Sequence, residues 1–170
     1  ARYFVEVTTI EELQDILENN SYPRKILIGG GSNMLLSDYI DALFIHVNLK
    51  GKQIVSQDDN NVIVKVMSGE NWHNMVMWAI DHDFGGLENM SLIPGNTGTA
   101  PIQNIGAYGV ELKDCFVSCE AVRIEDQQLV TLSKEECQFG YRDSFFKNEG
   151  KDKYVITTVT FSFTKKNQNT

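Results

Sequence analysis

Cysteine, proline and positive charge are all scarce in this sequence of 170 residues. The three cysteines, Cys115, Cys119 and Cys137, form no C-x-x-C pair and have no nearby histidine, so we expect reduced thiols and no metal site. Three prolines and 13 glycines exclude collagen-like and proline-rich disordered proteins. The 15 Lys and Arg residues against 23 Asp and Glu residues give a net charge of −8, so we expect no nucleic-acid partner.

Long apolar runs are absent as well. No stretch reaches the roughly 18 consecutive apolar residues of a membrane span, and the first four residues lead into a strand pattern rather than a signal peptide. We therefore expect a cytoplasmic protein with no membrane partner. Hydrophobic residues at 42% and charged residues at 22% are typical of a globular protein, either one domain or two small lobes that share a core.

The first third of the chain alternates strand and helix patterns. Short apolar runs at 3–7, 25–28 and 43–47 predict strands. Thr9 and Glu12 have the spacing of a capping box, which predicts a helix that ends near residues 19–20. The resulting order of strand, helix, strand, loop and strand favours a small sheet with parallel pairing.

The rest of the chain predicts mostly antiparallel strands. A strand at 62–67 precedes a helix from about 70 to 83, and runs at 116–124 and 128–132 have the pattern of a hairpin. A last strand is expected at 154–163. We expect one row of this strand to face the interior, namely Val155, Thr157, Val159, Phe161 and Phe163.

A glycine-rich segment directly follows the predicted strand at 25–28. It reads Gly29-Gly30-Gly31-Ser32-Asn33, and successive N–H groups in such a turn can form a nest for an anion. The segment lacks the spacing of a dinucleotide-binding G-x-G-x-x-G motif and the Gly-Lys-Ser/Thr ending of a P-loop. Phosphate binding and a tight turn at the end of a strand both remain open.

A second glycine-rich segment spans residues 85–109, which contain six glycines and two prolines. Long irregular segments in a compact domain are usually functional or disordered, and this one is too apolar for disorder. Two such loops could hold a diphosphate without lysines, which suits an acidic protein. A buried loop with a structural role is the alternative.

Arg142 lies between polar and aromatic residues in the segment 139–144. Its guanidinium group could hold a carboxylate through two parallel hydrogen bonds. The residues alone favour the alternative, a surface ion pair with Asp143 or Glu149.

Taken together, these segments resemble the UDP-N-acetylenolpyruvoylglucosamine reductases. The segments that carry the resemblance are 29–36, 69–73, 86–89, 93–98, 101–109 and 139–147, and their order and spacing agree from about residue 1 to residue 164. The resemblance implies an α+β fold, the FAD-binding (PCMH-type) domain of the vanillyl-alcohol-oxidase kind. FAD would lie between a small α/β lobe at 1–50 and a larger, mainly antiparallel lobe at 51–165, and 166–170 would be a polar tail.

The same resemblance implies a reaction. These enzymes convert UDP-N-acetylglucosamine enolpyruvate to UDP-N-acetylmuramate for peptidoglycan synthesis, and thereby serve cell-wall biogenesis, cell shape and cell division. NADPH delivers hydride to N5 of FAD, the hydride passes to the enolpyruvyl group, and a protein acid adds the proton. The resemblance implies that a C-terminal substrate-binding domain, which supplies this acid, lies outside the sequence, so we expect the fragment to hold FAD at best and to be inactive alone. We also expect a monomer.

The resemblance assigns roles to individual residues. Arg142 would polarise the substrate carboxylate as the catalytic residue, and Tyr108 would lie near both flavin and substrate. The implied FAD contacts are Gly29, Gly30, Gly31, Ser32, Asn33, Pro94, Gly95, Gly98, Thr99, Ile102, Gly106, Ala107 and Tyr108. A stand-alone flavin-binding or redox-sensing module and a non-catalytic interaction protein are the alternatives, and the presence of Arg142 argues against the second of these.

Overall fold

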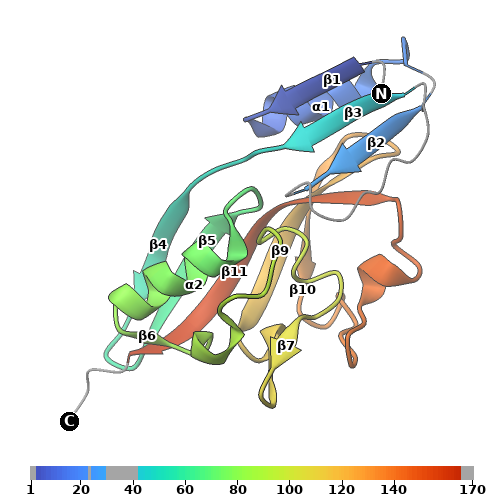
Figure 1. Ribbon diagram of the computed structural model, residues 1–170. Coiled ribbons are helices and arrows are strands. Elements are labelled where there is room, and N and C mark those ends of the chain that lie inside the picture. Colours follow the sequence, from blue (N-terminus) through green and yellow to red (C-terminus); the bar gives the residue numbers. More distant parts are fainter. Residues whose placement is uncertain (1–2, 23, 30–41, 166–170) are drawn as a thin grey trace.

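The computed structural model describes residues 3–22, 24–29 and 42–165, which form a small and a large sheet (Figure 1). The small sheet contains β1 (Tyr3–Val7), β2 (Lys25–Ile28) and β3 (Leu43–Val47) in the order β1-β3-β2. Both pairings are parallel. The parallel sheet expected from the first third of the sequence is confirmed.

Helix α1 (Ile10–Glu18) connects β1 to β2 and begins at the predicted capping box. Thr9 Oγ1 accepts a hydrogen bond from Glu12 N at 3.1 Å, and Glu12 Oε1 accepts one from Thr9 N at 3.1 Å. These bonds satisfy two N–H groups that the first turn of a helix would otherwise leave unpaired. Leu13 and Leu17 then bury the inner side of α1 in a small core, where each contributes roughly 1.5–3 kcal/mol.

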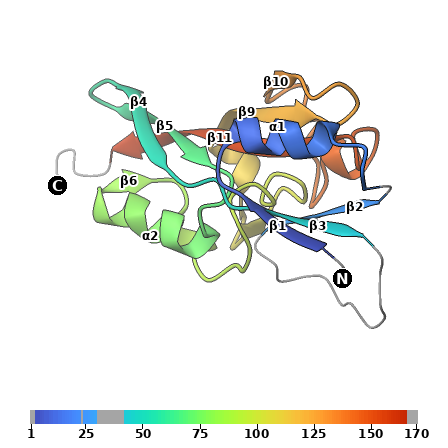
Figure 2. The same cartoon turned by 90° about the horizontal axis from the view of Figure 1, so that it is seen from above.

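The large sheet has the strand order β10-β9-β11-β5-β4, and β6 pairs with β11. All of its pairings are antiparallel. The strands are β4 (Lys52–Gln57), β5 (Asn61–Met67), β6 (Phe84–Gly85), β9 (Phe116–Arg123), β10 (Leu129–Ser133) and β11 (Tyr154–Lys165). Helix α2 (Trp72–Asp81) covers one face of this sheet (Figure 2).

The second glycine-rich segment, predicted to be irregular, contains only short elements. They are β6, a 3₁₀ helix at Glu88–Met90 and the start of a small hairpin formed by β7 (Gly106–Ala107) and β8 (Val110–Glu111). Two further 3₁₀ helices lie at Leu112–Asp114 and Phe145–Lys147. The segment packs on the large core because Leu87 and Met90 are buried there. Trp72 Nε1 fixes it further by donating a hydrogen bond to Met90 O at 2.9 Å.

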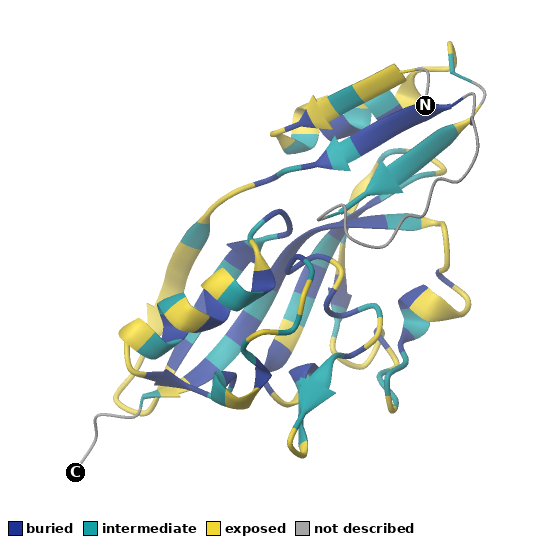
Figure 3. Cartoon of the chain, viewed as in Figure 1, coloured by how far each residue is buried: buried dark blue, intermediate teal, exposed yellow. Residues whose placement is uncertain are grey.

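Strand β11 is buried along most of its length (Figure 3). The prediction that alternate residues from Val155 to Phe163 all face one interior side is wrong. Val155 packs in the small core, whereas Ile156, Val159 and Phe161 pack in the large one. The cause is a β-bulge at Thr157, since Ile156 pairs with Ala121 and Thr158 pairs with Glu120, the next residue along β9. The extra residue reverses the side-chain alternation, so that one strand serves both cores.

The three thiols are free and buried, as expected for reduced cysteines. Burial raises the pKa of Cys115 to about 11. A hydrogen bond with Cys137, together with burial, also raises the pKa of Cys119. These thiols are therefore poor nucleophiles at neutral pH.

No helix in the three described ranges has the length and apolar character needed to cross a membrane. Across those same residues, no group of His, Cys, Asp and Glu side chains is arranged to hold a metal ion.

Candidate functional site

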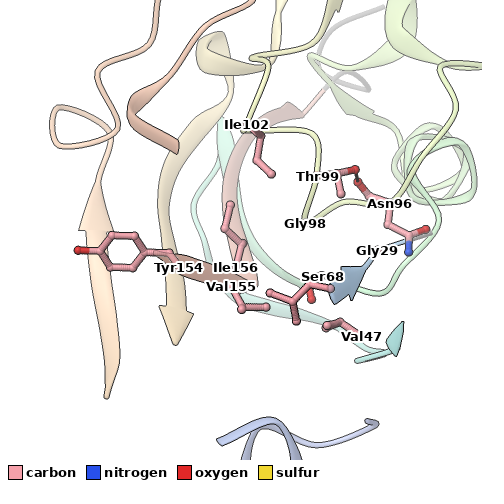
Figure 4. A pocket seen from close by; sticks show the side chains of 11 residues that line it. Gly29, Val47, Ser68, Asn96, Gly98, Thr99, Ile102, Tyr154, Val155 and Ile156 are labelled. Carbon is pink, nitrogen blue, oxygen red and sulfur yellow. Dashed lines mark hydrogen bonds between the residues drawn. The ribbon is translucent and has the colours of Figure 1, made fainter. Parts of the chain in front are cut away.

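A cavity of about 160 Å³ lies where the small and large sheets meet (Figure 4). Its polar side is formed by Gly29 at the end of β2, Ser68 after β5, and Asn96, Gly98 and Thr99 of the second glycine-rich segment. Because these residues come from three separate parts of the chain, the cavity exists only in the folded protein.

The other residues that line the cavity are mostly apolar. Leu27 and Val47 come from the small sheet, Ile102 from the second glycine-rich segment, and Tyr154 and Ile156 from the start of β11. An adjacent groove of about 420 Å³ shares Leu27, Ile102, Tyr154 and Ile156 with the cavity. The two hollows therefore lie side by side, and together they offer polar and apolar walls to an elongated ligand.

The turn after β5 holds the loop at 95–98 in place. Ser68 N donates to Thr157 O at 2.9 Å, at the bulge of β11, and Ser68 O accepts from Gly98 N at 3.0 Å. Thr97 N and Oγ1 both donate to Glu70 O, at 2.9 and 3.0 Å. The bulge that reverses the alternation of β11 thus also positions the polar side of the cavity.

Glycine is required at Gly98 for this close approach. A Cβ atom added there would lie 2.5 Å from the Cβ of Ser68, which no side chain could tolerate without movement. Gly29 also approaches this loop, since an added Cβ would lie 3.2 Å from Thr99 Cγ2. The two glycine-rich segments singled out in the sequence therefore meet at the same cavity.

The residues present fit a flavin dinucleotide. Within residues 3–22, 24–29 and 42–165, no charged side chain lines the cavity, and the buried Ser68 hydroxyl has no hydrogen-bond partner. The Ser68 hydroxyl and the Asn96 side-chain amide are suitable donors for a diphosphate, and the side chains of Ile102 and Ile156 are suitable for contact with an apolar ring.

Four of the predicted FAD-binding residues line the cavity: Gly29, Gly98, Thr99 and Ile102. Pro94 and Gly95 precede its polar side, and Gly95 O accepts a hydrogen bond from Trp72 N at 3.0 Å. The remaining residues of the first segment, Gly30, Gly31, Ser32 and Asn33, lie outside the described residues.

Gly106, Ala107 and Tyr108 form a separate small hairpin instead. Tyr108 and Gly109 have φ values of +54° and +79°, as the two central residues of a type I′ turn require. This turn places Tyr108 at the tip of the β7–β8 hairpin, where the residue is 88% exposed.

Arg142 lies against the base of this hairpin. Its Nη2 donates to Gly106 O at 3.0 Å, and its Nη1 lies 3.7 Å from Glu111 Oε2. The guanidinium carbon is 4.7 Å from the centre of the Tyr141 ring. Arg142 therefore pairs with Glu111, and not with Asp143 or Glu149 as the residues alone favoured.

The side chain of Arg142 retains capacity for a ligand. Its Nη1 is buried without a hydrogen-bond partner, and its backbone φ is +49°, an uncommon value for an arginine. Unusual backbone conformations and unpaired buried donors both gather at functional sites. Ser144 Oγ donates to Ile102 O at 2.7 Å and thereby ties the Arg142 loop to the cavity lining.

Asn104 is a site residue that the sequence analysis missed. Its Nδ2 donates to Glu111 Oε2 at 2.9 Å and to Gly140 O at 2.8 Å, and its Oδ1 accepts from Lys113 N at 2.9 Å. The residue is fully buried. The available signal was a polar amide between two apolar residues, Ile102 and Ile105.

Comparisons with known proteins agree with the geometry. A family model for the FAD binding domain matches residues 1–133. The UDP-N-acetylenolpyruvoylglucosamine reductase of Flavobacterium johnsoniae is 57% identical over 98% of this chain and 50% of its own length. The reductase of the same name from Bdellovibrio bacteriovorus is 45% identical, also over 98% of this chain and 50% of its own length. The chain thus spans about half the length of these curated relatives.

A solved structure shows the same fold. The crystal structure of UDP-N-acetylenolpyruvylglucosamine reductase from Thermus caldophilus matches with a TM-score of 0.76 and 23% identity, over 96% of this chain and 56% of that one. The α+β FAD-binding fold, the resemblance to these reductases and FAD as the cofactor are confirmed. The chain belongs to the FAD-binding domain family.

Proposed function

We propose that this chain is the FAD-binding part of an NADPH-dependent UDP-N-acetylenolpyruvoylglucosamine reductase. Such an enzyme converts UDP-N-acetylglucosamine enolpyruvate to UDP-N-acetylmuramate for peptidoglycan. The observation that carries the proposal is the meeting of Gly29 and the loop at 98–102 at one cavity, whose described lining residues are all uncharged. Relatives of that name, which match nearly the whole chain, support it.

The proposed FAD site has two parts. The first glycine-rich segment and the lining residues Gly98, Thr99 and Ile102 would hold the cofactor in the cavity, with Pro94 and Gly95 supporting their loop. The hairpin at 106–108 would contact the flavin from the Arg142 side. Bound FAD would supply hydride transfer from NADPH to the enolpyruvyl group.

Arg142 would bind the carboxylate of the enolpyruvyl group. Gly106 O and Glu111 orient its guanidinium group, and Nη1 makes no hydrogen bond in the described part of the chain. Because the carboxylate gains negative charge during reduction, a fixed cation stabilises the transition state more than the ground state. Tyr108 would contact the substrate beside it.

The same proposal includes the domain bounds, the location and the oligomeric state of the protein. We place the FAD-binding domain at 1–165, with lobes at 1–50 and 51–165, and the proton donor with most UDP contacts in the part of such reductases that this chain does not span. The enzyme would act as a cytoplasmic monomer in cell-wall biogenesis, and so support cell shape and cell division. We propose no nucleic-acid or membrane partner.

Two measurements test the proposal. An absorption spectrum of the purified chain after addition of FAD and gel filtration should contain a flavin band that co-elutes with protein. The natural protein that carries this segment should oxidise NADPH only when UDP-N-acetylglucosamine enolpyruvate is present. A flavin band without this oxidation would instead favour a flavin-binding module, and absence of the band would contradict the cofactor assignment.

A further inference from the structure

Ser68 lines the cavity with a hydroxyl group that has no partner. The residue is only 5% exposed, and its Oγ is one of two buried side-chain atoms in the described ranges that have no hydrogen-bond partner. Its backbone is fully used, because N donates to Thr157 O and O accepts from Gly98 N. The hydroxyl therefore makes no hydrogen bond with the described part of the chain, and its burial destabilises the folded chain.

The surroundings of Ser68 indicate what the hydroxyl could bind. The neighbouring hydroxyl, Thr99 Oγ1, is already used, since it donates to Asn96 O at 2.9 Å. None of the described residues that line the cavity has a charged side chain. Among the described lining residues, the side-chain donors that remain for an anionic ligand at the polar side are the hydroxyl of Ser68 and the amide of Asn96.

We propose that Ser68 Oγ donates a hydrogen bond to a diphosphate oxygen of bound FAD. The inference rests on the proposed function, because it takes FAD as the ligand. A buried polar group that costs stability and has no structural partner is best explained by a ligand that completes its hydrogen bonding. Gly98 keeps Ser68 in this position, since any larger residue there would collide with the Ser68 side chain.

The test is the variant Ser68→Ala in the chain described here. Its dissociation constant for FAD, measured by quenching of flavin fluorescence, should rise about tenfold, which corresponds to roughly 1.4 kcal/mol. The melting temperature of the ligand-free chain should stay the same or rise, because an unpaired buried hydroxyl is removed. Weaker FAD binding without a loss of melting temperature indicates a ligand contact. If Ser68 had a structural role, the replacement would lower both the affinity for FAD and the melting temperature.

Ser118→Ala is the matched control. Ser118 is a half-buried serine on β9, outside the cavity, and its replacement should leave the affinity for FAD unchanged. The ³¹P resonances of bound FAD should shift in Ser68→Ala and not in Ser118→Ala, which assigns the contact to the diphosphate.

The outcomes separate this inference from the proposed function. Unchanged affinity in Ser68→Ala, or weaker binding with unshifted ³¹P resonances, would overturn the inference alone. A lower melting temperature in the ligand-free variant would also overturn it, because the hydroxyl would then have a structural role. If the unmodified chain binds no FAD at all, both the inference and the proposed function fail.

Discussion

Asn104 and Arg142 share one carboxylate. Glu111 Oε2 accepts a hydrogen bond from Asn104 Nδ2 at 2.9 Å and lies 3.7 Å from Arg142 Nη1. The same Asn104 amide also donates to Gly140 O, two residues before Arg142 in the chain. A buried amide thus connects the second glycine-rich segment, the β7–β8 hairpin and the loop that carries the guanidinium group.

Asn104→Ala should lower the free energy of unfolding by about 2–4 kcal/mol. The variant leaves Glu111, Gly140 O and Lys113 N without their buried partner, and each unsatisfied group costs about 1–3 kcal/mol unless water reaches it. Urea denaturation would measure the loss, with Asn74→Ala on the exposed side of α2 as the control. Equal stability of the two variants would contradict the connecting role of Asn104.

Arg142→Ala in the natural full-length protein should lower kcat by at least about 100-fold, because the lost interaction acts mainly on the transition state. The dissociation constant for FAD should change little, since Arg142 is not among the residues that line the cavity. Lys134→Ala removes an exposed cation that does not line the cavity and should leave both quantities unchanged. Near-normal turnover in Arg142→Ala would refute the assigned role.

Local sequence patterns predicted most elements, because their causes are local. The capping box at Thr9 and Glu12 formed as expected, and the alternation of Val62, Val64 and Val66 marked the buried face of β5. Strand β4 was missed, since its residues are mostly exposed and give no apolar alternation. The bulge at Thr157 depends on how β11 pairs with β9, so no pattern within β11 alone could reveal it.

The sequence predicted less of the candidate site than of the helices and strands. Glycine-rich segments are visible in the composition of the sequence, and Gly29 and Gly98 from these segments line the cavity. Asn104 and Ser68 gain their importance from partners distant in sequence, such as Gly140 and Thr157. The role of such a side chain depends on contacts with residues that are distant in sequence. The residues next to it in the sequence therefore do not reveal that role.

Phe161→Ala should lower the free energy of unfolding by about 3–5 kcal/mol, the usual loss for a large side chain in a tight core. Phe161 is fully buried and packs on Trp72, with ring centres 6.1 Å apart, and on Phe163. Phe4→Ala is the control, because Phe4 is 65% exposed and its loss should cost much less. Similar losses in both variants, measured by urea denaturation, would contradict the packing described for β11.

The contribution of Glu70 to stability should disappear in acid. Burial alone would raise the pKa of this carboxyl, but hydrogen bonds from Lys52 Nζ at 2.9 Å and Gly51 N at 2.7 Å outweigh it and lower the pKa. Because the pKa is lower in the folded than in the unfolded chain, the ionised carboxylate stabilises the fold above the ordinary value of 4.5. This stabilisation is lost as the pH falls through the lowered pKa of the folded state.

Glu70→Gln should therefore be less stable than the unmodified chain at pH 7, and the difference should shrink steadily below about pH 4.5. Thermal unfolding at a series of pH values would measure it. Glu18→Gln, at the exposed end of α1, should show no comparable difference at pH 7. A stability difference for Glu70→Gln that stays constant from pH 7 to pH 3 would contradict the assignment, because it would then arise from packing and not from the charge that Lys52 and Gly51 bind.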